Sequence, residues 1–138
     1  MASDSPQVFA LRLNELIEQA KAAPDQVVRK VGLQIGARLV EQSPVDTGRF
    51  RANWNVAFGR IDPLTTPSTD KGGGQTKERI RVLLNGWPVG SDIYFTNSLP
   101  YAIPLEYGHS KQAPLGMVRI TVAEFQTFVD SAIKSLPQ

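Results

Sequence analysis

The single histidine of the chain, His109, lies three residues after Glu106 and directly before Ser110 and Lys111. A glutamate and a histidine three positions apart share one face of a helix, where they can bind a metal ion or transfer a proton. Gly108 between them disfavours a regular helix, and the chain has no second histidine to complete a ligand set. We therefore predict neither a metal site nor a cofactor.

A hydrolytic triad of Ser110, His109 and a carboxylate from Asp46 or Glu106 is disfavoured on similar grounds. A nucleophile and a base that are sequence neighbours rarely reach the required hydrogen-bond geometry, and the chain has no GxSxG elbow. The lack of cysteine excludes a thiol nucleophile, a disulfide framework and a cysteine-ligated metal. The sequence thus predicts a protein that is not an enzyme.

The stretch KGGGQTK, residues 71–77, shares only its glycines with a phosphate-binding loop. That motif needs two glycines separated by four residues, then Lys-Ser or Lys-Thr, and a helix. The spacing is not met, and we expect no helix after this stretch. Residues 60–77 are therefore interpreted as a long, flexible loop.

A length of 138 residues, with 41% hydrophobic and 20% charged, is typical of one soluble globular domain. No segment has the pattern of a secretory signal, and no apolar run approaches the ~20 residues that cross a bilayer, so we expect no membrane contact. The net charge is +2, yet residues 49–81 hold seven basic and three acidic residues. Such an excess is typical of a solvated surface, and a face for nucleic acid or for an acidic protein is the alternative.

Apolar residues at helical spacing predict three helices. The first runs from about Ser5 to Ala20 and the second from Asp25 to about Ser43, and we expect the two to form an antiparallel hairpin. Gly32 and Gly36 in the second helix indicate close approach by another element, because each costs about 1 kcal/mol relative to alanine. The last helix, within residues 118–136, carries a continuous apolar stripe.

Alternating apolar residues predict three strands, at 53–58, 79–84 and 93–96. Because they follow one another along the chain, we expect an antiparallel meander. The predicted fold class is α+β: a small antiparallel β-sheet of three to four strands, packed by an N-terminal helical hairpin and a C-terminal helix. Residues 1–138 are expected to form a single domain.

Two stretches are rich in polar, aromatic and proline residues that folding alone does not explain. Residues 43–54 read SPVDTGRFRANW, in which Pro44 ends a helix and Gly48 supplies a free backbone dihedral. Residues 97–119 read NSLPYAIPLEYGHSKQAPLGMVR and lead through a proline- and glycine-rich arm into the last helix.

Together, and in this order, these stretches resemble the small head-tail joining proteins of long-tailed bacteriophages, also called neck or tail completion proteins. The resemblance extends over about residues 25–136 and departs from the family's pattern mainly in the long loop. It implies a structural virion protein, assembled in the host cytoplasm as a six-fold or twelve-fold ring. The implied neighbours are the head-closure or connector protein and the tail terminator or tail tube protein, with double-stranded DNA passing through the lumen unread.

Segments 43–54 and 97–119 are predicted to touch these partners, because aromatic and charged side chains are typical of interfaces. We expect Arg49 and Arg51 to contact a carboxylate of a neighbouring subunit, with a local salt bridge as the alternative. For Tyr101 and Tyr107 the alternative is that they cover the sheet. The predicted interface residues are Asp46, Thr47, Arg49, Arg51, Tyr101, Glu106, Tyr107, His109 and Lys111.

Three other functions stay open. A tail terminator, which caps the tail tube, has a similar α+β layout. A nonspecific DNA-binding module would use the basic excess and lose affinity steeply with salt. An enzyme built on Glu106 and His109 would need a pocket and at least one more convergent polar group. If the docking interpretation is correct, loop 60–77 gains protection from amide exchange on assembly.

Overall fold

Three antiparallel strands form the sheet of this protein. The structure is a computed structural model that describes residues 7–11, 24–100, 102, 106 and 116–136. Within them, β1 (Gln7–Leu11) and β2 (Trp54–Phe58) both pair with β3 (Ile93–Asn97), so that β3 lies in the middle. Among the described residues, β1 and β2 are therefore the two edges of the sheet.

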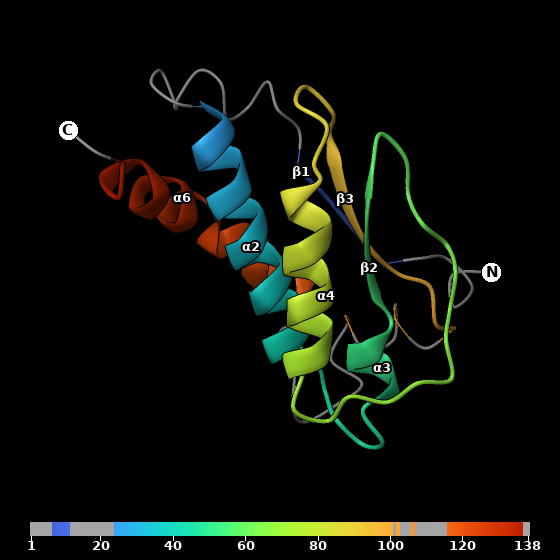
Figure 1. Ribbon diagram of the computed structural model, residues 1–138. Helices are drawn as coiled ribbons and strands as arrows, with labels where there is room; N and C mark the ends of the chain where they lie inside the picture. Colours follow the sequence, from blue (N-terminus) through green and yellow to red (C-terminus); the bar gives the residue numbers. More distant parts are fainter. Residues whose placement is uncertain (1–6, 12–23, 101, 103–105, 107–115, 137–138) are drawn as a thin grey trace.

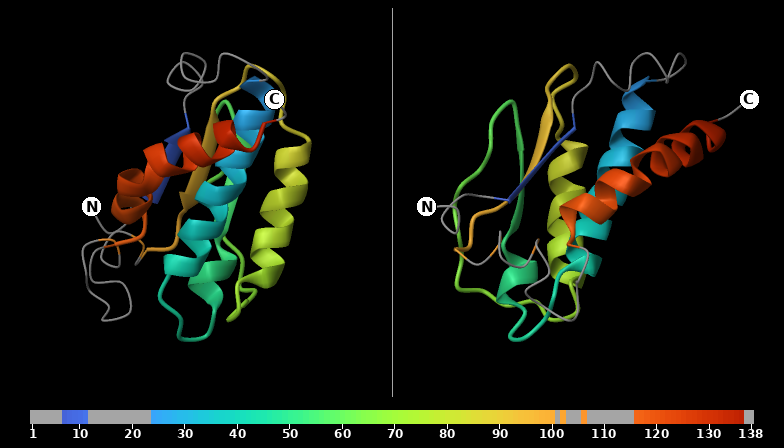
Figure 2. Two further views of the ribbon diagram at one scale, coloured as in Figure 1. Left: turned by 90° about the vertical axis from the view of Figure 1, so that its left-hand side faces the viewer. Right: turned by 180° about the vertical axis from the view of Figure 1, so that it is seen from behind.

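The helices lie together on one face of this sheet (Figure 1). Helix α2 (Pro24–Gln42) packs between α4 (Gly74–Asn85) and α6 (Val118–Lys134), and α6 also contacts β1 while α4 contacts β2. Figure 2 shows α2 and α4 running alongside each other, with α6 crossing α2 obliquely. The short α3 (Arg49–Ala52) leads directly into β2. The described part of the chain is thus a two-layer α+β structure.

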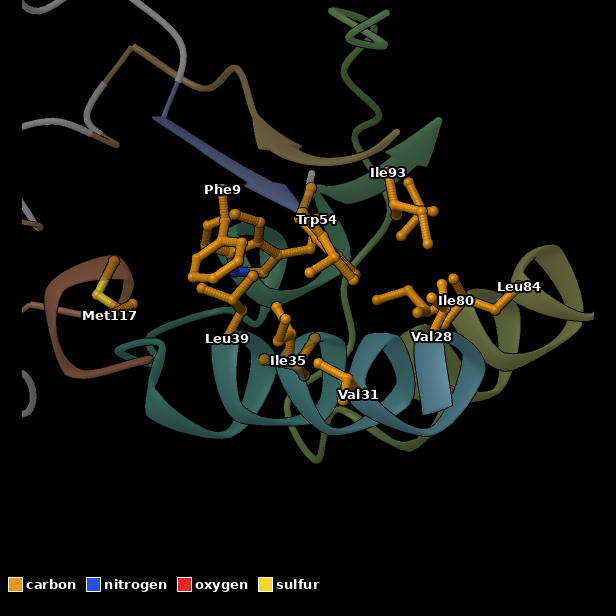
Figure 3. Close-up of a cluster of buried hydrophobic side chains, with 14 of the residues drawn as sticks. Phe9, Val28, Val31, Ile35, Leu39, Trp54, Ile80, Leu84, Ile93 and Met117 are labelled. Atoms are coloured by element: carbon orange, nitrogen blue, oxygen red, sulfur yellow. The ribbon is translucent and has the colours of Figure 1, made fainter. Parts of the chain in front are cut away.

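The core fills the space between the two layers. Ile35 and Leu39 recur at helical spacing along α2, are fully buried, and point toward Phe9 and Trp54 in Figure 3. Phe95, at the centre of β3, packs edge-on against Phe9 with 6.2 Å between ring centroids. Burial of these large side chains is the main favourable contribution to folding.

The close approach expected at the two glycines of α2 is confirmed. A Cβ atom at Gly36 would lie 2.8 Å from Cγ2 of Ile80, and one at Gly32 would lie 3.3 Å from Cδ2 of Leu84. Both neighbours belong to α4. The missing side chains therefore let α4 pack directly against α2.

The predicted N-terminal helical hairpin is wrong. Residues 7–11 form β1, with Gln7, Phe9 and Leu11 buried and the residues between them half-buried. This period of two is the pattern of a strand, and the backbone of β3 supplies its hydrogen-bond partners. Phe9 fits the apolar stripe of a helix as well as the alternation of a strand, so the sequence pattern alone does not distinguish the two elements. Residues 12–23, the rest of that predicted helix, lie outside the described residues.

The predicted strand at 79–84 is also wrong, because these residues belong to α4. Thr76, Ile80 and Leu84 are buried at intervals of four, so one helical face meets the core. Val82, which the alternating pattern placed inside, is 55% exposed. The sheet has three strands as expected, but β1 replaces this segment, and the expected meander is wrong since the strand order is β1-β3-β2.

The remaining predicted elements are confirmed with small shifts. Helix α2 ends at Gln42 just before Ser43-Pro44, β2 and β3 lie where alternation predicted them, and α6 covers most of 118–136. The loop after β2 ends at Gly73, because residues 74–77 already belong to α4; its predicted mobility stays a prediction. No helix in the described ranges has the length and apolar content to cross a bilayer.

Candidate functional site

The segment 43–54 folds as a compact turn held by its own side chains. The Trp54 indole donates a 2.8 Å hydrogen bond to Oγ of Ser43, which in turn donates to the carbonyl of Leu39 at 2.6 Å. This chain ties the start of β2 to the last turn of α2. Both Ser43 and Trp54 are buried, so these polar atoms are satisfied inside the protein.

Arg51 connects three parts of the backbone. Its Nε and Nη2 donate to the carbonyls of Ser43 (3.2 Å) and Glu41 (3.1 Å), and its Nη1 donates to the carbonyl of Lys71 (2.8 Å). A guanidinium has five N–H donors in a fixed fork, which suits such a junction. The geometry therefore gives Arg51 a local role through carbonyl groups, whereas the local alternative was a salt bridge. Its predicted contact with another subunit stays a prediction.

The side chains of Arg49 and Asn53 bind the middle of the long loop. The Thr66 carbonyl accepts from Nε of Arg49 (3.1 Å) and from the amide nitrogen of Asn53 (3.0 Å). The Thr66 N–H donates back to Oδ1 of the Asn53 side chain at 2.8 Å. The middle of the loop is thus fastened to the end of α3, a role that the sequence did not indicate for Asn53.

The tip of the segment is exposed. Asp46 and Thr47 both face solvent, and Asp46 makes no hydrogen bond or ion pair with a described residue. Gly48 beneath them has φ +91°, and a Cβ there would lie 2.5 Å from the backbone nitrogen of Lys71. Only glycine allows this close crossing of two loops. Of the predicted interface residues in this segment, Asp46 and Thr47 are the two available to a partner.

Glu106 is buried and binds the start of α6. Its Oε1 accepts the N–H groups of Met117 and Val118 at 2.8 Å each, and its Oε2 accepts the N–H of Arg119 at 2.9 Å. Nε of Arg119 adds a salt bridge at 3.1 Å, and the side-chain amide of Gln7 in β1 donates to the same carboxylate. Free helix N–H groups and the helix dipole both favour a carboxylate at this position.

Glu106 is therefore a structural anchor in the described structure, where it joins β1 to the start of α6. Every bond named above goes to backbone or side chain of β1 or α6. His109 and Ser110, the other members of the catalytic sites that the sequence disfavours, lie outside the described residues, as do Tyr101, Tyr107 and Lys111. The sequence contains the glutamate, but it does not indicate that this residue caps α6, because Glu106 lies eleven residues before the N-cap Met117.

The two unusual segments meet in space. The side-chain amide of Asn97, the first residue of the second segment, donates to the carbonyl of Phe50 at 2.9 Å. Asn97 also stands opposite Trp54 in the β2–β3 pair. Both side chains of this pair are buried. Segment 43–54 and the start of segment 97–119 therefore form one continuous piece of structure.

A helix does follow the glycine-rich stretch, contrary to expectation, and Asp70 caps it. Oδ2 of Asp70 accepts from the N–H and the hydroxyl of Thr76 at 2.7 and 2.8 Å, and Oδ1 accepts from the N–H of Gly73 at 3.1 Å. Partial burial raises the pKa of Asp70, but these bonds from Thr76 and Gly73, with the charge of Arg51, outweigh it and hold the pKa below its usual value. The protein's own carboxylate thus satisfies the N–H groups of Gly73 and Thr76 at the start of α4.

Most of the basic residues between 49 and 81 have partners within the chain. Three arginines donate to backbone carbonyls, while a fourth arginine and a lysine pair with glutamates. In sequence order these five are Arg49, Arg51, Lys77, Arg79 and Arg81. Their positions are explained by local structure, so the basic excess gives no separate argument for nucleic-acid binding.

A cavity of about 540 Å³ lies between the long loop, the start of β2 and α4. Much of its polar lining is already engaged in hydrogen bonds within the protein. The side-chain amide of Asn55 donates to the carbonyl of Leu64 at 2.7 Å, and Arg79 donates to the carbonyls of Ala52 and Trp54 at 3.0 Å each. No cluster of three potential metal ligands occurs among the residues that the structure describes. The cavity therefore offers no constellation of convergent groups for a reaction.

Comparison of the chain with protein-family models, curated proteins and solved structures found no match.

Proposed function

We propose that this protein is a structural component of the neck of a long-tailed phage, where it joins the tail to the head. The observation that carries the proposal is the contact between segment 43–54 and the start of segment 97–119, through Asn97 and the carbonyl of Phe50. These are the two stretches that resemble the head-tail joining family. A resemblance made of two segments gains weight when both belong to one structural unit.

The chemistry of the segments supports a structural role. Glu106, which the sequence placed in a disfavoured catalytic site, caps α6, and Arg51 joins loops. What remains free in the first segment is an exposed acidic tip, Asp46–Thr47. A rigidly held tip with a free carboxylate fits a contact with a basic surface of a neighbouring protein.

In this proposal the protein forms a six-fold or twelve-fold ring in the virion. Its neighbours are the head-closure or connector protein and the tail terminator or tail tube protein, and double-stranded DNA passes through without sequence reading. Such a ring needs contacts that repeat between different faces of one subunit and close on themselves. The tip 46–47 is one candidate for these contacts.

The decisive experiment is deletion of the coding sequence in the phage, followed by electron microscopy of the lysate. We expect filled heads and tails of normal length that are not joined, and restored joining on complementation. Tails of abnormal length would instead favour the tail terminator, because a cap on the tube limits its growth. Normal infectious particles that lack this polypeptide would contradict both functions.

A charge reversal at the tip tests the role of the free carboxylate. Asp46→Lys is expected to reduce joining in the complementation assay without changing the unfolding curve, since Asp46 is exposed and unbonded among the described residues. Asp130→Lys, at another exposed aspartate on the outer side of α6, is the matched control. Equal joining by both variants would remove the tip from the interface.

A further inference from the structure

The two edges of the sheet are not equivalent. The outer side of β2 is occupied at its start, where Nη2 of Arg79 binds the carbonyl of Trp54 at 3.0 Å and the Asn55 amide holds the loop at the carbonyl of Leu64. Figure 1 shows this loop running down beside β2. A further strand cannot pair along this edge without displacing these groups.

The outer side of β1 has no such cover from the described residues. A groove of about 240 Å³ lies between β1 and α6, and it is lined by six apolar residues. They are Val8, Phe9, Ala10, Val118, Val122 and Phe125. Successive residues of a strand point to opposite faces, so a groove lined by 8, 9 and 10 together must run along the edge, where the backbone is accessible.

An edge strand of this kind is usually protected. Natural proteins place charged residues, prolines or bulges on exposed edges, because unpaired N–H and C=O groups recruit other strands. The sequence of β1, QVFAL, has none of these, and Val122 beside it is 57% exposed. An apolar edge without protection indicates a surface that is covered by another strand in the working protein.

We propose that the edge of β1 is covered by β1 of a second copy of this chain, in antiparallel orientation about a two-fold axis. A copy has two sheet edges, and its β2 edge is obstructed by Arg79 and the loop, so β1 is the strand that it can offer. The groove has no charged lining, so two copies meet there without repulsion of like charges.

The charges that flank the strand in the sequence fit the same orientation. Asp4 precedes β1 and Arg12 follows it. Antiparallel pairing of two such strands brings an acidic end toward a basic end twice, whereas parallel pairing brings like charges together. In the resulting six-stranded sheet, Val122 and Phe125 of both copies cover the seam. The dimer concerns the free protein and goes beyond the proposed neck function.

The second apolar patch on the described surface fits self-association less well. It is formed by Val82 and Leu83 on α4, next to Glu78 and Arg79, and the strand that α4 contacts, β2, has its edge obstructed by Arg79 and the loop. This patch provides the control instead, because Val82 and Val122 are both helical valines, 55% and 57% exposed.

The first test is the mass of the protein in solution by analytical ultracentrifugation over a dilution series. We expect a monomer–dimer equilibrium whose dissociation constant rises about tenfold or more in Val122→Lys and is unchanged in Val82→Lys. Circular dichroism and urea unfolding of both variants establish that the fold is kept. A monomer at every concentration, or an equal loss of dimer in both variants, would overturn the proposal.

The second test is amide hydrogen exchange of residues 7–11 as a function of protein concentration. Strand pairing slows exchange of the outward N–H groups of β1 as the dimer fills, while exchange in β2 stays constant. If exchange in β1 is independent of concentration and slows only when another virion protein is added, the occupant is not a second copy and the proposal is wrong. Neither result depends on whether the polypeptide occurs in phage necks, which particle analysis decides separately.

Discussion

The N-cap residues of helices α4 and α6 make no capping hydrogen bond with their own side chains. Each helix is instead capped by a carboxylate from earlier in the chain. For α4 this is Asp70, only three residues before the N-cap Gly73. For α6 it is Glu106, eleven residues before the N-cap Met117. The two devices use the same chemistry, a carboxylate on free helix N–H groups.

The difference between them lies in what each cap holds together. Asp70 is partly exposed and fixes one turn, whereas Glu106 is 5% exposed and joins β1, α6 and the two ends of the arm. A local cap stabilises a helix, while a remote cap also closes a loop and fixes tertiary structure. We therefore expect disruption near Glu106 to cost more stability than disruption near Asp70.

The largest effect is expected from Gly116→Ala. Gly116 has φ +83°, and a Cβ there would overlap both the carbonyl oxygen and the carboxylate of Glu106. Strain at a positive φ and steric overlap with backbone together predict a loss of about 4 kcal/mol in the free energy of unfolding, measured with urea. Gly90→Ala is the control, since Gly90 has φ +100° but open space around it. Equal losses in the two variants would show that the contact with Glu106 is unimportant.

Glu106→Ala is expected to follow, with a loss of about 3 kcal/mol. It removes the acceptor of three backbone N–H groups at the start of α6, two of them from Met117 and Val118. The ion pair with Arg119 adds little, because that side chain is half exposed. Glu124→Ala, which removes a surface pair with Arg38, should cost only about 0.5 kcal/mol. A comparable cost in both would contradict the anchoring role.

The sequence predicted those elements whose pattern fits only one period. Helix α2 repeats its apolar residues at three and four positions, and β2 alternates strictly between Trp54 and Phe58. The sequence pattern gave the wrong element where residues fit both the helical and the strand period. Ile80 and Leu84 are four apart, as in a helix, but they also belong to an alternating run, as in a strand. Only the buried Thr76 identifies the helix. Such ambiguity is resolved by packing against α2, which the sequence does not reveal.

The two unusual segments could be distinguished in the sequence, but the contacts within them could not be predicted. The start of the second segment adjoins the first through Asn97 and Phe50. The bonds of Arg51 and Glu106 to distant backbone groups depend on the tertiary fold, since their partners lie up to twenty residues away. The cap at Asp70 was visible in principle, as an aspartate shortly before a helix, but the glycines nearby favoured the flexible-loop interpretation.

The local cap should give a smaller effect than the remote one. Asp70→Ala removes the acceptor of the Gly73 and Thr76 N–H groups, and we expect a loss of about 1 kcal/mol in the free energy of unfolding. Thr76→Val, which removes only the hydroxyl donor, is the milder companion variant. A loss as large as that of Glu106→Ala would contradict the distinction between local and remote caps.

The smallest expected effect is the pH dependence of this local cap. The folded state holds the pKa of Asp70 below its usual value, because the bonds from Thr76 and Gly73 and the charge of Arg51 outweigh the opposing effect of burial. A carboxyl with a lowered folded pKa stabilises the protein above its unfolded pKa and loses that contribution as the pH falls through the folded value. The stability difference between wild type and Asp70→Ala should therefore be constant above about pH 5 and shrink as the pH falls below about 4. Other titrating groups cancel in this difference, so a gap that stays constant or widens in acid would show that the ionised carboxylate is not what caps α4.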